Sequence, residues 1–357
     1  MIPLRLPAAC DADAPYVTRL GSSDDGSGGT CRLVGARGDR SLWSGQNGLL
    51  EIVHDDERVE GDVVLVDPRS GHVERLIRAT SRHNTFLVTE QCDQLCVMCS
   101  QPPKKTHNDR YRFFEEACLL ADSGVTIGIS GGEPTLHKSR LFDMIEAVLA
   151  LRPDLKFHVL TNGQHFERSD VERLRRPVFR QVVWGIPMYA ADPTCHDEIV
   201  GKPGAFERLL GSLHHLVASA ARIELRTVLL SRNAPELDAL AHFLARHLPQ
   251  IEQWSLMDLE NAGFARAKFR ELRIPLSERF SEVAPGIDRA LLHGLPVRLF
   301  NVPLCHVPAS YRHLAVASIS DWKQRFSDAC GTCDVKSKCS GFFEWHPADL
   351  VEKVHPL

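Results

Sequence analysis

The chain has 357 residues, of which 43% are hydrophobic and 25% charged, and its formal net charge is −4. This is the composition of an ordinary globular protein, long enough for one large domain with smaller attachments. The small negative charge gives no case for nucleic-acid or anionic-membrane binding, and no apolar run is long enough to span a bilayer.

The amino-terminal segment and the cysteine content together indicate a reducing compartment. Residues 1–6 lack the apolar core and the cleavage site of a secretory signal, so we expect a cytoplasmic protein. Without export, the eleven cysteines are more typical of metal or cluster ligands than of disulfides. Seven of them fall into two sets, a triplet and a quartet: Cys92, Cys96 and Cys99, then Cys305, Cys330, Cys333 and Cys339.

Residues 1–80 predict a small β-rich domain. Two runs of strand character, 62–66 and 72–77, flank the turn residues 67–71, which is the pattern of a β-hairpin. An exposed hairpin edge can accept an added strand, so one hypothesis is that this domain docks a partner peptide. The other is that it covers the side of the next domain.

Residues 81–270 predict a parallel α/β sheet. Short apolar runs alternate with amphipathic stretches, and this alternation implies right-handed crossovers between parallel strands. The carboxyl ends of such strands meet at one edge, where active sites are built. The six apolar runs are 86–89, 126–129, 157–161, 182–187, 223–229 and 254–257, with helical stretches near 110–122, 138–151, 167–175, 205–218 and 235–246.

Beyond residue 270 the alternation fades and proline recurs, so we assign 271–357 to a separate, loop-rich C-terminal module. The cysteine quartet lies in this module.

The triplet directly follows the first apolar run, with C-x3-C-x2-C spacing. Thiolates are the usual ligands of iron–sulfur clusters. A four-iron cluster held by three cysteines keeps one iron open to an outside ligand, whereas a structural zinc site normally closes its shell with four residues. The spacing therefore favours a catalytic cluster.

Two more motifs follow the next strands, Gly131-Gly132-Glu133-Pro134 and Thr161-Asn162-Gly163. In this order the three motifs resemble those of the radical S-adenosylmethionine (radical SAM) enzymes. The resemblance implies a partial (β/α)6 barrel, a [4Fe–4S] cluster and SAM bound to the open iron. It also implies reductive cleavage of SAM to a 5′-deoxyadenosyl radical, with an electron donor such as flavodoxin or ferredoxin.

The resemblance also implies roles for single residues, and each has a plainer alternative. Met98 would lie near the adenine or simply pack. Glu133 would join the SAM ammonium site or pair within the barrel. Arg226 would bind the SAM carboxylate or pair with an acid. The predicted cluster ligands and catalytic residues are Cys92, Cys96 and Cys99, and the predicted SAM contacts are Met98, Gly131, Gly132, Glu133, Pro134, Thr161, Asn162 and Arg226, with Asp258, Glu260 and Asn261 as weaker candidates.

The quartet can close a metal shell by itself, either as a structural zinc site or as a second [4Fe–4S] cluster. Spacing does not decide between them. The C-x2-C-x5-C tail, however, resembles radical SAM peptide maturases that carry an auxiliary cluster, and we favour iron–sulfur on that ground. The predicted ligands are Cys305, Cys330, Cys333 and Cys339.

Three further stretches, 96–103, 318–323 and 339–343, resemble the His-Xaa-Ser system radical SAM maturases of the C type. That family is associated with a ribosomally made precursor peptide carrying His-Xaa-Ser repeats and with a second radical SAM protein. The implied function is modification of the peptide. Two alternatives stay open: a radical SAM enzyme acting on a small molecule, and a non-catalytic cluster-binding partner of another maturase.

Overall fold

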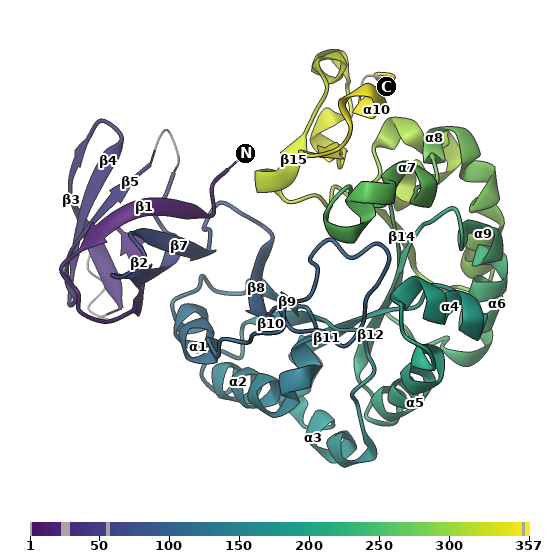
Figure 1. The fold of residues 1–357 in the computed structure, drawn as a ribbon, viewed down its shortest axis with the longest axis horizontal. Helices are drawn as coiled ribbons and strands as arrows, with labels where there is room; N and C mark the ends of the chain where they lie inside the picture. Colours follow the sequence, from purple (N-terminus) through teal and green to yellow (C-terminus); the bar gives the residue numbers. More distant parts are fainter. Residues whose placement is uncertain (1, 23–28, 55–57, 352–353) are drawn as a thin grey trace.

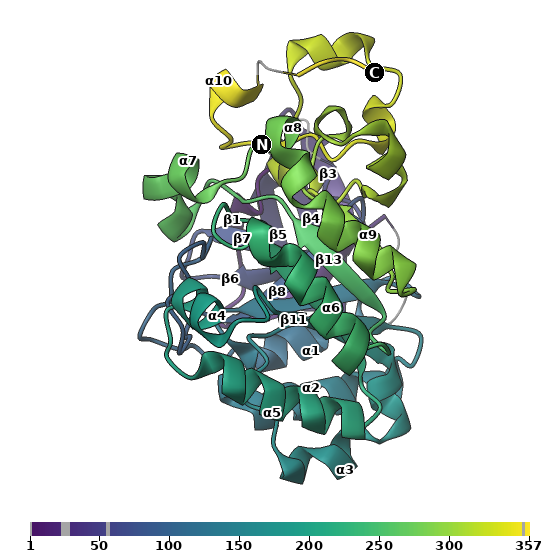
Figure 2. The same cartoon turned by 90° about the vertical axis from the view of Figure 1, so that its right-hand side faces the viewer.

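The computed structural model describes residues 2–22, 29–54, 58–351 and 354–357. These residues fold into a closed β-barrel, a large parallel sheet covered by helices, and a small C-terminal unit (Figure 1). Figure 2 shows the C-terminal unit at one end of the molecule, opposite helices α3 (Val171–Leu174) and α5 (Ala205–Ala218). Among the described residues, no helix has the length and apolar character needed to cross a membrane.

The N-terminal barrel has its strands in the order β1-β5-β4-β3-β2-β6-β7 and closes where β1 pairs with β7. All neighbours are antiparallel except β2 and β3. Large apolar side chains such as Leu20, Trp43 and Leu50 fill its interior. The strands are β1 (Arg5–Cys10), β2 (Tyr16–Gly21), β3 (Thr30–Arg37), β4 (Arg40–Gly45), β5 (Gly48–Val53), β6 (Val63–Asp67) and β7 (His72–Ile77).

The predicted hairpin is confirmed as β6 and β7, but the strand-addition hypothesis for it is wrong. Strand β6 pairs with β2 on its outer side, and β7 pairs with β1. Closure of a barrel leaves no row of unpaired backbone groups on these strands to bind an added one. The hypothesis that the barrel covers a neighbour fits better, because its residues Val17, Leu65 and Ile77 pack in one core with Phe86 and Phe114.

The second sheet has seven parallel strands in sequential order: β8 (Asn84–Thr89), β9 (Thr126–Gly131), β10 (Lys156–Leu160), β11 (Val182–Pro187), β12 (Arg222–Val228), β13 (Gln253–Met257) and β14 (Val297–Phe300). The predicted α/β class and all six predicted strands are confirmed. The helices that cover the sheet include α1 (Tyr111–Leu119), α2 (Lys138–Leu151), α3, α4 (Pro193–Val200), α5, α6 (Leu237–His247) and α9 (Ala284–Leu292).

The seventh strand corrects the sequence prediction. Strand β14 pairs with β13, yet we had placed it in the C-terminal module, so the sheet extends past residue 270. The prolines that suggested a loop are compatible with regular structure here. Pro285 lies in the first turn of α9, where a missing N–H costs nothing, and Pro296 precedes β14. Four residues are too few to show a sequence period.

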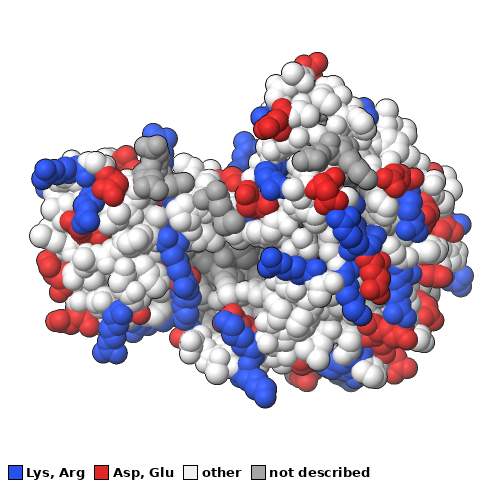
Figure 3. All heavy atoms as spheres, turned by 45° about the horizontal axis from the view of Figure 1, so that its top comes forward, with Lys and Arg blue, Asp and Glu red and all other residues white. Residues whose placement is uncertain are grey.

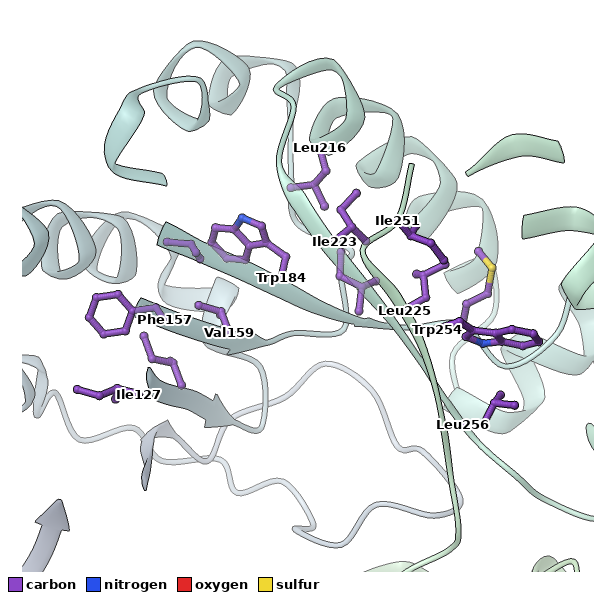
Figure 4. Close-up of a cluster of buried hydrophobic side chains, with 14 of the residues drawn as sticks. Ile127, Phe157, Val159, Trp184, Leu216, Ile223, Leu225, Ile251, Trp254 and Leu256 are labelled. Carbon is purple, nitrogen blue, oxygen red and sulfur yellow. The ribbon is translucent and has the colours of Figure 1, made fainter. Parts of the chain in front are cut away.

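Alternation along the strands separates the apolar and polar faces of the sheet. Phe157 and Val159 of β10 and Trp184 of β11 are fully buried in the core beneath the helices (Figure 4). The intervening residues His158 and Glu224 contact each other across the other face, at 2.5 Å. A parallel sheet is normally apolar on both faces, so these inward polar residues mark the concave side as a place for chemistry.

The C-terminal unit is built mainly from short turns, with a two-stranded pair of β15 (Gln324–Arg325) and β16 (Phe342–Phe343) and the helix α10 (Ala348–Val351). It is fastened to the start of the large sheet by Arg78, whose two Nη atoms donate to the Asp321 carboxylate at 2.8 and 2.9 Å. Figure 3 shows a recess between the two lobes of the molecule, with basic and acidic side chains on its rim.

Candidate active site at the carboxyl ends of the strands

The triplet lies on the loop after β8, and two neighbouring segments hold its backbone. Leu95 and Val97 donate their N–H groups to the carbonyls of Val200 and Ile199, at the end of α4. Phe264 donates to the carbonyl of Cys99 at 2.9 Å. A Cβ at Gly263 would lie 2.1 Å from the Cys99 oxygen, so only glycine allows this contact. The loop is therefore fixed before any ligand binds.

The three thiols are close enough to affect one another. Burial raises the pKa of the Cys96 thiol to about 12, and the charges of Cys99 and Cys92 add to the effect. Burial also raises the pKa of Cys92 to about 11. Half-buried thiols whose pKa values are all raised need a cationic group to become thiolates together, and an iron–sulfur cluster is such a group. In the described parts of the chain, no three Cys, His, Asp or Glu side chains converge on a single metal ion. A four-iron cluster, being larger, holds its ligands further apart.

The Gly131-Gly132-Glu133-Pro134 turn packs against the segment that leads into the triplet. A Cβ at Gly132 would lie 2.2 Å from the carbonyl oxygen of Gln91, and one at Gly131 would lie 2.5 Å from that of Thr89. Both glycines are thus required for contact between two backbones. That contact brings the turn to the edge of the sheet where the triplet lies.

Glu133 joins two strand ends, and its predicted contact with the SAM ammonium stays a prediction. Its side chain is completely buried, and its carboxylate accepts hydrogen bonds from Thr135 N at 2.7 Å, Thr161 Oγ1 at 2.6 Å and Asn162 N at 2.5 Å. Burial raises the pKa of Glu133 in spite of these donors. Glu133 therefore joins the ends of β9 and β10, and Pro134 and the Thr161 side chain are buried with it.

Asn162 lies between that junction and the cysteine loop. Its side-chain Nδ2 donates to Asp93 Oδ1 at 2.8 Å. Asp93 also accepts a hydrogen bond from Lys202 Nζ, and His165 Nε2 lies 3.3 Å from its carboxylate. Burial alone would raise the pKa of Asp93, but the neighbouring His165 and Lys202 hold it well below its usual range. Sequence reasoning missed Asp93, although it is the only charged residue between the first and last cysteine of the triplet.

Arg226 takes the plainer of its two predicted roles. Its Nη1 donates to both carboxylate oxygens of Glu224, at 2.9 and 3.1 Å, and its Nη2 contacts the Met257 sulfur at 3.3 Å. Burial would raise the pKa of Glu224, but the contacts with His158 and Arg226 lower it to about 2. Arg226 therefore forms an internal ion pair with Glu224, and its predicted contact with the SAM carboxylate stays a prediction.

Met98 also follows its plainer alternative and packs in an apolar cluster with Tyr189, Ile199 and Leu259. This cluster backs the cysteine loop, so Met98 helps to exclude water from it. These packing contacts do not test the predicted contact of Met98 with the adenine, which stays a prediction.

The three weaker candidates after β13 fasten other parts of the chain. Asp258 is buried beside Arg273, at 3.6 Å. Glu260 pairs with Lys323 of the C-terminal unit, and Asn261 donates to the carbonyl of Trp345 at 2.9 Å. These contacts show how the sheet edge and the C-terminal unit are joined.

The quartet forms a second centre. All four sulfur-bearing residues line one apolar cavity, together with Phe326 and Phe342. Backbone N–H groups point at the sulfurs: those of Leu304 and Gly341 lie 3.3 and 3.4 Å from Cys339 Sγ, and that of Leu357 lies 3.5 Å from Cys333 Sγ. Hydrogen bonds of this kind stabilise cluster thiolates. The thiols thus line one cavity, and backbone N–H groups donate hydrogen bonds to two of the sulfurs, as a bound cluster requires.

Comparison with known proteins supports the same assignment for the central part of the chain. The family model described as the radical SAM superfamily matches residues 86–244. The match covers less than half of the chain. The matched residues hold β8 to β12 and the triplet.

Individual relatives are more distant. The chain is 27% identical over 156 residues to an AdoMet-dependent heme synthase of Methanosarcina barkeri, a match covering 42% of this chain and 43% of that protein. It thus spans less than half of this curated relative. Among solved structures, Streptococcus suis SuiB gives a TM-score of 0.50 at 17% identity, over 70% of this chain and 55% of that one. The same protein bound to S-adenosylmethionine gives 0.49 at 16% identity, over 60% and 49%. At such identities the likeness concerns the fold alone.

Proposed function

We propose that the protein is a radical SAM enzyme that modifies a ribosomally made precursor peptide of the His-Xaa-Ser type. The observation that carries the first part is the arrangement of Cys92, Cys96 and Cys99. They form a coupled set of thiols on a pre-formed loop at the carboxyl ends of parallel strands, within the residues that the radical SAM family model matches. When it is bound, a [4Fe–4S] cluster would supply the electron that cleaves SAM to a 5′-deoxyadenosyl radical.

The residues of this chain have distinct tasks in that proposal. Cys92, Cys96 and Cys99 would hold three irons and leave the fourth open. Glu133 keeps the ends of β9 and β10 together, so the backbone of Gly131 and Gly132 stays beside the loop. Met98 and Tyr189 shield the loop from water on one side. Such rigid support is what a radical reaction needs, since stray water and misplaced groups quench it.

We further propose that the quartet holds a second [4Fe–4S] cluster rather than zinc. Four thiols around one apolar cavity, with N–H donors aimed at two sulfurs, support this assignment. Anaerobic reconstitution should then give about eight irons per chain, as two four-iron clusters require. About four irons with one zinc would remove the second cluster from the proposal.

The proposal includes a peptide substrate and a second radical SAM maturase as partner because of the motifs in 96–103, 318–323 and 339–343. It includes a flavodoxin or ferredoxin as electron donor because of the resemblance to radical SAM enzymes. The cytoplasmic location belongs to it through the cysteine content. A structure of SuiB with its precursor peptide SuiA gives a TM-score of 0.47 at 16% identity, over 60% of this chain and 48% of that one, too distant to name a substrate for this chain.

The test is co-expression with a precursor that carries His-Xaa-Ser repeats, followed by mass spectrometry of the peptide. A mass change that disappears when Cys92, Cys96 and Cys99 are all replaced by alanine is the expected result. Formation of 5′-deoxyadenosine by the purified enzyme without any change in the peptide would point to a small-molecule substrate. Absence of 5′-deoxyadenosine under any reductant would leave only a non-catalytic role.

A further inference from the structure

Asp93 makes an unusual set of contacts for a residue inside a cluster-binding loop. Its carboxylate accepts hydrogen bonds from Asn162, in the loop after β10, and from Lys202, in the segment after α4, and His165 Nε2 lies 3.3 Å away. The side chains of Asp93 and Lys202 are 24% and 26% exposed. A pair shielded to this degree is screened by solvent less than a surface pair, so its charges act on nearby groups.

The position of Lys202 relative to the triplet is fixed by the backbone. Lys202 follows Gly201, which ends α4 in a left-handed conformation at φ 66°. A Cβ at Gly201 would lie 2.5 Å from the Leu95 oxygen, so the helix end touches the middle of the cysteine loop. The hydrogen bonds from Leu95 and Val97 to the two residues before Gly201 hold the same contact. The backbone of Lys202 is therefore fixed beside the loop, and the hydrogen bond to Asp93 holds its ammonium group.

We propose that Asp93 and Lys202 are a compensated charge pair that sets the reduction potential of the cluster held by the triplet. Reduction adds an electron, so a carboxylate next to Cys92 makes the cluster harder to reduce, and an adjacent ammonium group makes it easier. In the native protein the two effects nearly cancel. The pair is a positioning and tuning device rather than a contact with the reacting atoms, and it rests on the proposed binding of a cluster.

The test is a redox titration of the reconstituted enzyme, followed by electron paramagnetic resonance of the reduced cluster. Lys202→Met leaves the Asp93 charge uncompensated and should shift the midpoint potential to more negative values. Asp93→Asn leaves the Lys202 charge and should shift it in the opposite direction. The double variant should return close to the native value. Damage to the fold would not produce shifts of opposite sign that cancel.

Matched controls are available on the outer helices. Arg289 of α9 pairs with Asp238 of α6 through two hydrogen bonds, and neither contacts the cysteine loop. Arg289→Met and Asp238→Asn should leave the potential unchanged. If Asp93→Asn does not take up iron, Lys202→Met and Lys202→Arg still decide the matter, because Lys202→Arg keeps the charge and should keep the native potential.

The proposal is overturned if both single variants shift the potential in the same direction, or if neither shifts it while iron content is normal. These outcomes differ from failure of the proposed function, in which the native chain itself takes up no iron at Cys92, Cys96 and Cys99. All variants are also made in a chain with Cys330 and Cys333 replaced by alanine. This removes the signal of a cluster at the quartet from that of the cluster at the triplet.

Discussion

The two sets of cysteines are built on different kinds of scaffold. The triplet lies on one short loop whose backbone is held by the end of α4 and the loop after β13. The carboxylate of Asp93 in this loop is contacted by Asn162 and Lys202. The quartet is spread from Cys305 to Cys339 over short turns with little regular structure. The first site is formed by the fold. Among its described residues, the second unit has a small apolar cluster around Phe342, Val351 and Val354. Under the proposed function, we infer that a metal bound by the quartet orders this unit.

The largest expected effect is on the triplet. Replacing Cys96 by alanine should abolish SAM cleavage, because the cluster loses one of its three ligands, while the fold is retained since the loop is held by backbone contacts. Chromatographic detection of 5′-deoxyadenosine measures the activity, and far-ultraviolet circular dichroism checks the fold. Residual cleavage above a tenth of the native rate would contradict the assignment of Cys96.

Substitution in the quartet should disturb the C-terminal unit and leave SAM cleavage intact. Replacing Cys330 and Cys333 by alanine should lower iron from about eight to about four per chain and loosen the C-terminal unit, because its metal holds it together. Limited proteolysis with mass spectrometry should show cleavage confined to residues 301–357. SAM cleavage in the absence of peptide should continue. Unchanged protease resistance in this variant would show that the unit is ordered by its protein contacts alone.

A smaller effect is expected at Glu133, which tests whether the triplet's scaffold depends on buried hydrogen bonds. Glu133→Gln places an amide donor among groups that all donate to the native carboxylate, and should destabilise the protein by about 1–3 kcal/mol. Urea unfolding measures this, with the exposed Glu207→Gln as the matched control. A loss of unfolding free energy no larger than that of the control would mean that the hydrogen bonds of Glu133 do not stabilise the fold.

The smallest effect is expected at the contact between the two regions. Asp321→Asn weakens the bidentate contact with Arg78, whose side chain is only 4% exposed. Because the Asp321 side chain is 41% exposed, the expected cost is only about 1 kcal/mol. Amide hydrogen exchange should be faster around residue 321 and unchanged in the triplet loop. Faster exchange in both places would show that the two regions are not independent.

The sequence predicted the strands well because apolar runs report burial directly, and the order of the motifs on those strands placed the site. It could not name the partners of Glu133 and Arg226, because the fold brings those partners together. Glu133 and Thr161 are 28 residues apart in the sequence, and only the register of β9 and β10 places them together. Glu224 precedes Arg226 by two residues on the same strand face, a pattern that could have predicted their pairing.

The seventh strand and the closed barrel were missed for a related reason. Strand β14 is four residues long and follows a proline, so it has no readable period. Closure of the N-terminal barrel depends on the pairing of β1 with β7, the first and last strands, and no local pattern reports such a contact. Both features arise from pairing over long distances along the chain.

The contact between Arg78 and Asp321 joins residues 243 positions apart. At ribosomal rates of 5–20 residues per second, the acidic partner leaves the ribosome roughly 10–50 s after the basic one. During this interval the cysteine triplet has already been synthesised, while the unit that ends the molecule has not. Under the proposed function, iron can therefore enter the triplet before the residues of the quartet have been synthesised.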